Sequence, residues 1–168
     1  MSRPLIDAIR DKKWLYADPA MADHATYSKN DLAGLLELGV PERTVEVLRA
    51  APFRHVEAVC QESALIAPSS EGEHGLVFED PPRLIETAHT WVGRRVIEKG
   101  YLLFGDSSAG GDPYCFDLTG AELEDPPVVL LSTSGIGHPS WESTNPVAPV
   151  CRRASDLIRA LQFVRSLS

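Results

Sequence analysis

The chain has 168 residues, of which 43% are hydrophobic and 24% charged, and its net charge is −8. This length suits one domain with its own core, and the apolar fraction excludes a disordered chain. The apolar runs are short, far below the roughly 20 residues that a membrane-spanning helix needs.

The cysteines and the N-terminus indicate where the protein works. Cys60, Cys115 and Cys151 are odd in number and widely spaced, which argues against a disulfide framework and for a reducing compartment. The first residues carry charges every few positions and lack the apolar core of a secretory signal. We therefore expect a cytoplasmic protein that does not associate with a membrane.

Acidic residues are concentrated in the middle of the chain. Between Glu57 and Asp125, fourteen Asp or Glu stand against four Lys or Arg, a local balance of −10. Such a surface repels nucleic acid and attracts basic proteins. A soluble acidic surface without a specific partner has the same pattern, so charge alone names no partner.

The first predicted elements are helices. Residues 1–27 form a polar lead-in with one short helix around residues 5–10. Ser28 or Asn30 can cap the next helix, which runs to Leu38. We therefore expect the folded domain to cover residues 28–168, with residues 1–27 as an N-terminal extension.

A second helix follows Gly39 and Pro41. Gly39 suits the left-handed position after a helix, and Pro41 suits the first turn of the next one. The segment 55–66 fits a helix or a strand, and we favour helix followed by strand, then a polar loop over 69–75 and a short strand over 76–79. Residues 81–95 predict one further helix. Its apolar positions are Leu84, Ile85, Ala88, Trp91 and Val92, and those of the helix after Pro41 are Val45, Val47 and Leu48.

The second half predicts strands. Residues 101–105, 113–118 and 127–131 are short, apolar or alternating, and their short connections imply antiparallel neighbours. A long polar loop covers 132–149, and Ser155 can cap a last helix to Val164. Helices, a strand meander around residues 101–131 and a closing helix predict an α+β domain with a mostly antiparallel sheet.

The Gly/Asp-rich stretch 106–112 joins two of these strands. A phosphate loop is excluded because Gly110 and Gly111 precede Asp112 and a proline, not Lys-Ser/Thr and a helix. A calcium loop lacks its helical flanks, which leaves a loose cation site as an alternative. We interpret the stretch as a structural turn in which the two glycines reverse the chain. The side chains that would tie it down are Asp106, Ser108 and Asp112, and we expect Asp117, in the following strand, to bond a neighbouring backbone group.

This interpretation makes a prediction. Replacing Gly110 and Gly111 by valine should lower the melting temperature, and any loss of function should follow from that. Unchanged melting with abolished function would contradict the structural assignment.

Catalytic and metal-binding motifs are weak. Ser134 and His138 share a loop without the strand-to-helix turn of a serine hydrolase. None of the five histidines stands at metal-ligand spacing to a cysteine, and we expect neither a metal nor a cofactor. For the tryptophans, we expect Trp91 in the core and Trp141 as a loop anchor, with stacking on a base or sugar as the alternative.

Taken together, the motifs resemble the SUKH superfamily, which includes fungal cell-wall-synthesis regulators and many bacterial immunity proteins. Residues 102–105, 106–112, 114–117 and 127–131 match its central pattern: an apolar strand ending in glycine, a Gly/Asp-rich turn, a tyrosine–x–hydrophobic–aspartate strand and a proline–valine–hydrophobic strand. LLELGVPERTVEVLRAA resembles the helical leader, and the last helix resembles the closing helix of the family. The resemblance covers roughly residues 28–165.

The resemblance implies binding and not catalysis. Bacterial members of this type neutralise a cognate polymorphic toxin domain by protein–protein interaction, so we expect an immunity protein that is not an enzyme and whose partner has a basic cleft. By charge and loop position, the candidate contacts are Glu71, Glu73, Glu79, Asp80, Glu122, Glu124 and Asp125, with Trp141 as an anchor.

Two alternatives remain open. One is a regulatory or scaffold module of the same fold without a toxin partner, because a fold does not fix a function. The other is a small hydrolase that uses Asp106, Asp112 or Ser134 with His138.

Overall fold

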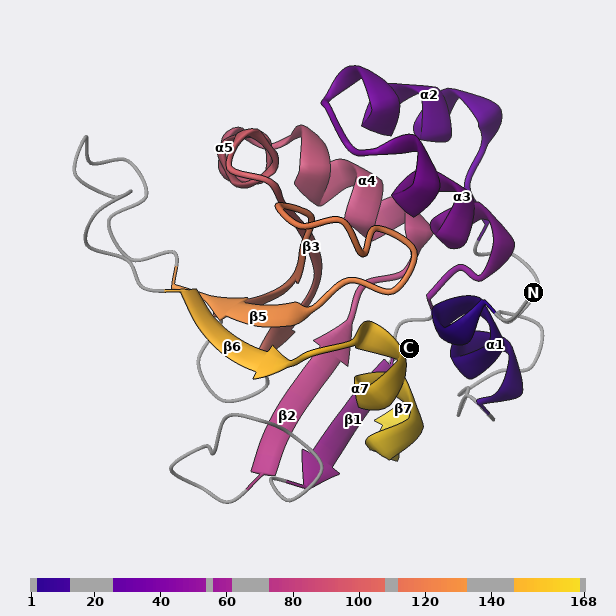
Figure 1. Cartoon of the computed structure of the whole chain (residues 1–168), viewed down its shortest axis with the longest axis vertical. Helices are drawn as coiled ribbons and strands as arrows, with labels where there is room; N and C mark the ends of the chain where they lie inside the picture. Colours follow the sequence, from indigo (N-terminus) through magenta and orange to yellow (C-terminus); the bar gives the residue numbers. More distant parts are fainter. Residues whose placement is uncertain are drawn as a thin grey trace.

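In the computed structural model, the described residues form six helices and one curled antiparallel sheet of seven strands (Figure 1). These residues are 3–12, 26–53, 56–61, 73–107, 112–132 and 147–166. The helices are α1 (Pro4–Asp11), α2 (Lys29–Glu37), α3 (Glu42–Ala50), α4 (Pro81–His89), α5 (Trp91–Glu98) and α7 (Ala154–Ala160). The strands are β1 (Val56–Gln61), β2 (Glu73–Phe78), β3 (Tyr101–Ser107), β4 (Pro113–Asp117), β5 (Val128–Leu131), β6 (Val147–Cys151) and β7 (Leu161–Ser166).

The sheet is a meander to which the last strand adds at the β1 edge. Its order is β6-β5-β4-β3-β2-β1-β7, so the chain crosses from one edge to the other before β7 returns beside β1. Every pairing is antiparallel, as the short connections predict. The α+β class with a mostly antiparallel sheet is therefore confirmed.

Helix α2 begins where the sequence predicts. The Ser28 hydroxyl accepts a hydrogen bond from the Asp31 N–H at 3.0 Å, and the Asp31 carboxylate accepts one from the Ser28 N–H at 2.8 Å. This reciprocal capping box satisfies two backbone donors that the first turn leaves free. Gly39 has a φ of 97° after the helix, as its left-handed position requires.

The predicted single helix over 81–95 is two helices. The Thr90 hydroxyl donates to the Thr87 carbonyl at 2.6 Å and accepts from the Gly93 N–H at 3.1 Å, which ends α4 and begins α5. Position 93 needs glycine, because a Cβ there would lie 2.0 Å from the Thr87 carbonyl oxygen. Trp91 starts α5 and is 57% exposed, so the prediction that it lies in the core is wrong.

The structure has strands where the sequence favoured other elements. The segment favoured as helix within 55–66 contains β1, and the predicted polar loop over 69–75 gives way to β2 at Glu73. β1 lies between β2 and β7, so both its edges are paired, and its inward residues Ala58 and Cys60 are buried. Pairing on both edges favours a strand over a helix in an apolar segment that fits either.

The end of the chain differs in the same way. β6 begins within the predicted loop 132–149, and the predicted closing helix ends at Ala160. The next residues, Leu161–Ser166, form β7 and pair with β1 from Val56 to Cys60. Pairing with the free edge of β1 thus favours a strand over a continued helix after Ala160.

The core has two layers of apolar side chains. Four phenylalanines from one face of the sheet and the segment after α3 pack together in the main cluster, in stacked and tilted pairs with ring centroids 4.3 to 5.9 Å apart. On the opposite face, Val96 of α5 covers a smaller cluster from β3, β4 and β5. The four rings are Phe53, Phe78, Phe104 and Phe116. Both faces of β4 are therefore buried, and Cys115 is fully buried in the smaller cluster.

Helix α1 contributes to the main core. Leu5, Ile6, Ala8 and Ile9 are buried there, and α1 lies beside α7 (Figure 1). The Arg10 guanidinium donates to the Ala50 carbonyl at 3.1 Å, which ties α1 to α3. Part of the predicted N-terminal extension thus shares the core of the domain predicted for residues 28–168.

Candidate protein-interaction surface

The loop between β4 and β5, residues 118–127, carries three of the candidate acidic contacts. We call it the β4–β5 loop. Asp125 is 8% exposed, and its carboxylate accepts hydrogen bonds from the Ser155 N–H at 2.8 Å and the Ser155 hydroxyl at 2.7 Å. Ser155 lies in the first turn of α7, where backbone N–H groups have no acceptor within the helix. Asp125 therefore caps α7 from a distant loop.

This arrangement corrects the expectation for the last helix. The sequence predicts that Ser155 caps it, but the N-cap residue is Arg153, which makes no side-chain capping bond. Ser155 instead lies inside the helix and donates to Asp125. A carboxylate at a helix N-terminus is favoured electrostatically as well.

Further bonds fix the β4–β5 loop against the helices. The buried Thr44 hydroxyl of α3 donates to the Leu123 carbonyl at 3.1 Å. The Ala154 N–H donates to the Pro126 carbonyl at 2.8 Å. The loop is therefore held by both α3 and α7, while Glu122 and Glu124 remain exposed on it.

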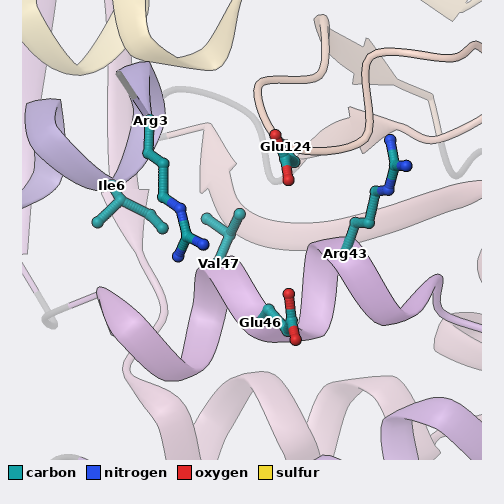
Figure 2. A pocket seen from close by; sticks show the side chains of 6 residues that line it. All are labelled: Arg3, Ile6, Arg43, Glu46, Val47 and Glu124. Atoms are coloured by element: carbon teal, nitrogen blue, oxygen red, sulfur yellow. The ribbon is translucent and has the colours of Figure 1, made fainter. Parts of the chain in front are cut away.

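A shallow groove lies between this loop, α1 and α3 (Figure 2). In Figure 2, Glu124 faces α3 from the loop, with Arg3 on one side and Arg43 on the other. The groove is lined by Arg3, Ile6, Arg43, Glu46, Val47 and Glu124. Within the described part of the chain, no ion pair joins its four charged side chains. Both signs of charge are thus available to a partner.

The structure separates the predicted contact residues into three groups. In the first group, Glu122 and Glu124 are exposed and Asp80 is half-buried. The Asp80 carboxylate also caps α4, because it accepts a hydrogen bond from the Arg83 N–H at 3.2 Å. Glu79 and Asp125 are only 9% and 8% exposed, so their side chains offer little surface to a partner. Outside the described residues lie Glu71, Trp141 and the side chain of Glu73.

The predicted turn between β3 and β4 is described at its two ends. The Ser107 N–H donates to the Asp112 carbonyl at 2.8 Å, and Asp106 pairs with Pro113 in the sheet. The Asp117 carboxylate accepts from the Thr119 N–H at 2.9 Å, which confirms the expected bond to a neighbouring backbone group. Outside the described residues lie Ser108, Gly110, Gly111, Ser134 and His138.

Sequence reasoning missed the contribution of α1 and α3 to this surface. Arg43 and Glu46 are exposed on α3, three positions apart on one helical face. Thr44 could have indicated this contact, because it stands next to Val45 and both are buried. A buried hydroxyl needs a hydrogen-bond partner. That the partner is the β4–β5 loop follows only from the tertiary structure.

Comparison of the chain with family models, with curated proteins and with solved structures found no match. Among the described residues, no group of three or more His, Cys, Asp or Glu side chains is placed to hold a metal ion. The same part of the chain holds no helix with the length and apolar character needed to cross a membrane.

Proposed function

We propose that this protein is a non-catalytic immunity protein of the SUKH type, which binds and neutralises a toxin domain with a basic cleft. The observation that carries the proposal is the exposed pair Glu122 and Glu124 on a loop fixed by Asp125 and Thr44. An acidic surface that is already ordered loses little conformational freedom on binding. Its charge also accelerates the encounter with a basic partner.

The mixed charges of the neighbouring groove support a protein partner over a small cation. Arg3 and Arg43 would repel a simple cation beside Glu124, whereas a protein surface can offer groups of both signs. Val47 and Ile6 line the groove between these charges, but each is only 4% exposed, so the groove offers a partner mainly charged groups. The proposed contact surface therefore combines the β4–β5 loop with the exposed face of α3.

The experiment compares two charge-reversed variants with the wild-type protein. E122K/E124K alters the proposed surface, and E37K/E86K makes the same change in net charge at exposed positions of α2 and α4. Each tagged protein is used to capture its partner from the native cell at moderate salt. The captured polypeptide's C-terminal domain is then produced alone, and association rates and growth rescue are measured.

We expect the wild type and E37K/E86K to form a one-to-one complex and to restore growth. E122K/E124K should associate at least about tenfold more slowly at low salt. Equal effects of the two double variants would show that this surface is wrong. Capture of non-toxic housekeeping proteins, with no growth rescue, would favour a scaffold and contradict the immunity function.

A further inference from the structure

Glu79 is a buried carboxyl group with an incomplete set of partners. It follows β2 directly, and its backbone N–H donates to the Phe104 carbonyl at 3.0 Å. Its Oε1 accepts from the Thr87 hydroxyl of α4 at 3.3 Å. Its Oε2 is fully buried and has no hydrogen-bond partner among the described residues. A charged oxygen in such a place is costly.

A second unpartnered polar atom belongs to Tyr27, in the segment that enters α2. Its hydroxyl oxygen is buried without a hydrogen-bond partner in the described part of the chain, and its ring packs against the main core. Burial, and then the carboxylates Asp80, Glu79 and Asp31, raise the pKa of Tyr27. The Glu79 carboxylate thus contributes to the raised pKa of Tyr27, which relates the start of α2 to the junction of β2 and α4.

Titratable and polar groups near Glu79 lie on β3, β4 and α4 and at Asp80, directly before α4. Burial and the Asp106 carboxylate of β3 raise the pKa of Glu79 to about 7, with Asp80 adding to the rise. The Thr87 hydrogen bond and the Arg83 guanidinium of α4 act in the opposite direction but do not compensate. On β4, the buried Cys115 thiol has its pKa raised by burial and, to a smaller extent, by Asp106 and Glu79.

We propose that Glu79 acts as a proton-controlled latch, which holds α4 and the segment entering α2 against the sheet when protonated and loosens them when ionised. The neutral carboxyl keeps the Thr87 hydrogen bond without placing a charge beside Asp106. The ionised carboxyl has no cation hydrogen-bonded to it among the described residues. Ionisation thus destabilises this junction and not the whole sheet.

The sign of the pH dependence follows from the two states. The pKa of Glu79 is about 7 in the folded protein and 4.5 without its surroundings. The closed junction therefore holds its proton more tightly than the open one, and the stability it contributes is complete below pH 4.5 and is lost as pH rises through 7. From about pH 5 to pH 8, the opening equilibrium constant should rise roughly fifty- to a hundredfold.

Hydrogen exchange read by mass spectrometry tests this directly on the full chain. After correction for the intrinsic rate, the wild-type amides of residues 26–37 and 81–90 should open more as pH rises from about 5 to 8. E79Q, which keeps an acceptor for Thr87, should give a flat profile. E86Q, an exposed change on α4, should behave like the wild type. A flat wild-type profile, or an E79Q slope equal to that of the wild type, would overturn the proposal.

A second measurement covers the case in which E79Q does not fold. The carbon-13 shift of the Glu79 carboxyl can be followed by NMR in the wild-type protein. A midpoint near 7 supports the latch, and a midpoint near the ordinary value of about 4.3 contradicts it. Both experiments are independent of any toxin, so they separate the latch from the proposed function.

Discussion

Removing the Asp125 carboxylate should destabilise the protein more than any exposed acidic change. D125A deletes the acceptor of two hydrogen bonds at a position only 8% exposed. The Ser155 N–H then loses its capping partner in the first turn of α7. The Ser155 hydroxyl, which is fully buried, loses its partner as well.

The magnitude follows from these two losses. Loss of a helix N-cap costs about 1 kcal/mol, and a buried polar group left without a partner adds about 1–3 kcal/mol. We therefore expect D125A to lower the free energy of unfolding by about 3 kcal/mol. D125N should cost about 1 kcal/mol, because its amide oxygen still accepts from the Ser155 N–H while its amide N–H₂ can donate to the hydroxyl. S155A, which removes only the hydroxyl, should cost about 1–2 kcal/mol.

Urea unfolding followed by circular dichroism measures these changes. The set comprises the wild type, D125A, S155A, the double variant and E122Q as an exposed control on the same loop. E122Q should stay within about 0.5 kcal/mol of the wild type. The double variant should be more stable than the sum of the single effects implies, because both remove the same bond. Full additivity, or a D125A effect below about 0.5 kcal/mol, would refute the capping argument.

Two further predictions concern the core. A Cβ at Gly105 would lie 2.6 Å from the Val77 carbonyl oxygen, so G105A should lower the unfolding free energy by about 1–3 kcal/mol. G120A is the control, because nothing lies within 4 Å of its Cβ and it should change the urea midpoint little. Equal urea midpoints for G105A and G120A would contradict the prediction. All three cysteines are buried and none forms a disulfide, and burial raises the pKa of Cys151 to about 12. A thiol reagent should therefore label the protein only in denaturant, and immediate labelling of the native protein would argue against this packing.

Local signals predicted the elements that depend on neighbouring residues. The capping box at Ser28 and the left-handed Gly39 lie within one turn of the ends of α2, so the sequence alone identifies that helix. The strands β3, β4 and β5 are bounded by glycine or proline and joined by short loops, which also makes their antiparallel pairing predictable.

The elements that the sequence predicted wrongly depend on partners distant in the chain. The apolar positions Leu157, Ile158, Leu161 and Val164 continue one helical stripe, yet the helix ends at Ala160. The pairing partner of the following residues is β1, about a hundred positions earlier in the chain. No local pattern shows that a free strand edge will be present there, so tertiary pairing overrides propensity.

The same distinction applies to the candidate site. Charged residues are rarely buried, so Glu79 and Asp125 were expected on the surface. Asp125 is buried because its loop lies against α7, where it bonds to Ser155, 30 positions later in the chain. That contact cannot be read from the neighbouring residues. Glu79 is buried because α4 folds back to place Thr87 against it.

These two buried carboxylates, nearly equal in exposure, have opposite consequences for the fold. Both oxygens of Asp125 accept short hydrogen bonds, and the helix N-terminus beside them favours a negative charge. Among the described residues, only one oxygen of Glu79 accepts a bond, at 3.3 Å, and the Asp106 carboxylate raises the pKa of Glu79 by its charge of the same sign. Burial alone therefore does not decide whether a carboxylate stabilises its surroundings. The number of donors and the sign of the local field decide it, which makes Asp125 an anchor for the β4–β5 loop and Glu79 a group that responds to the proton concentration.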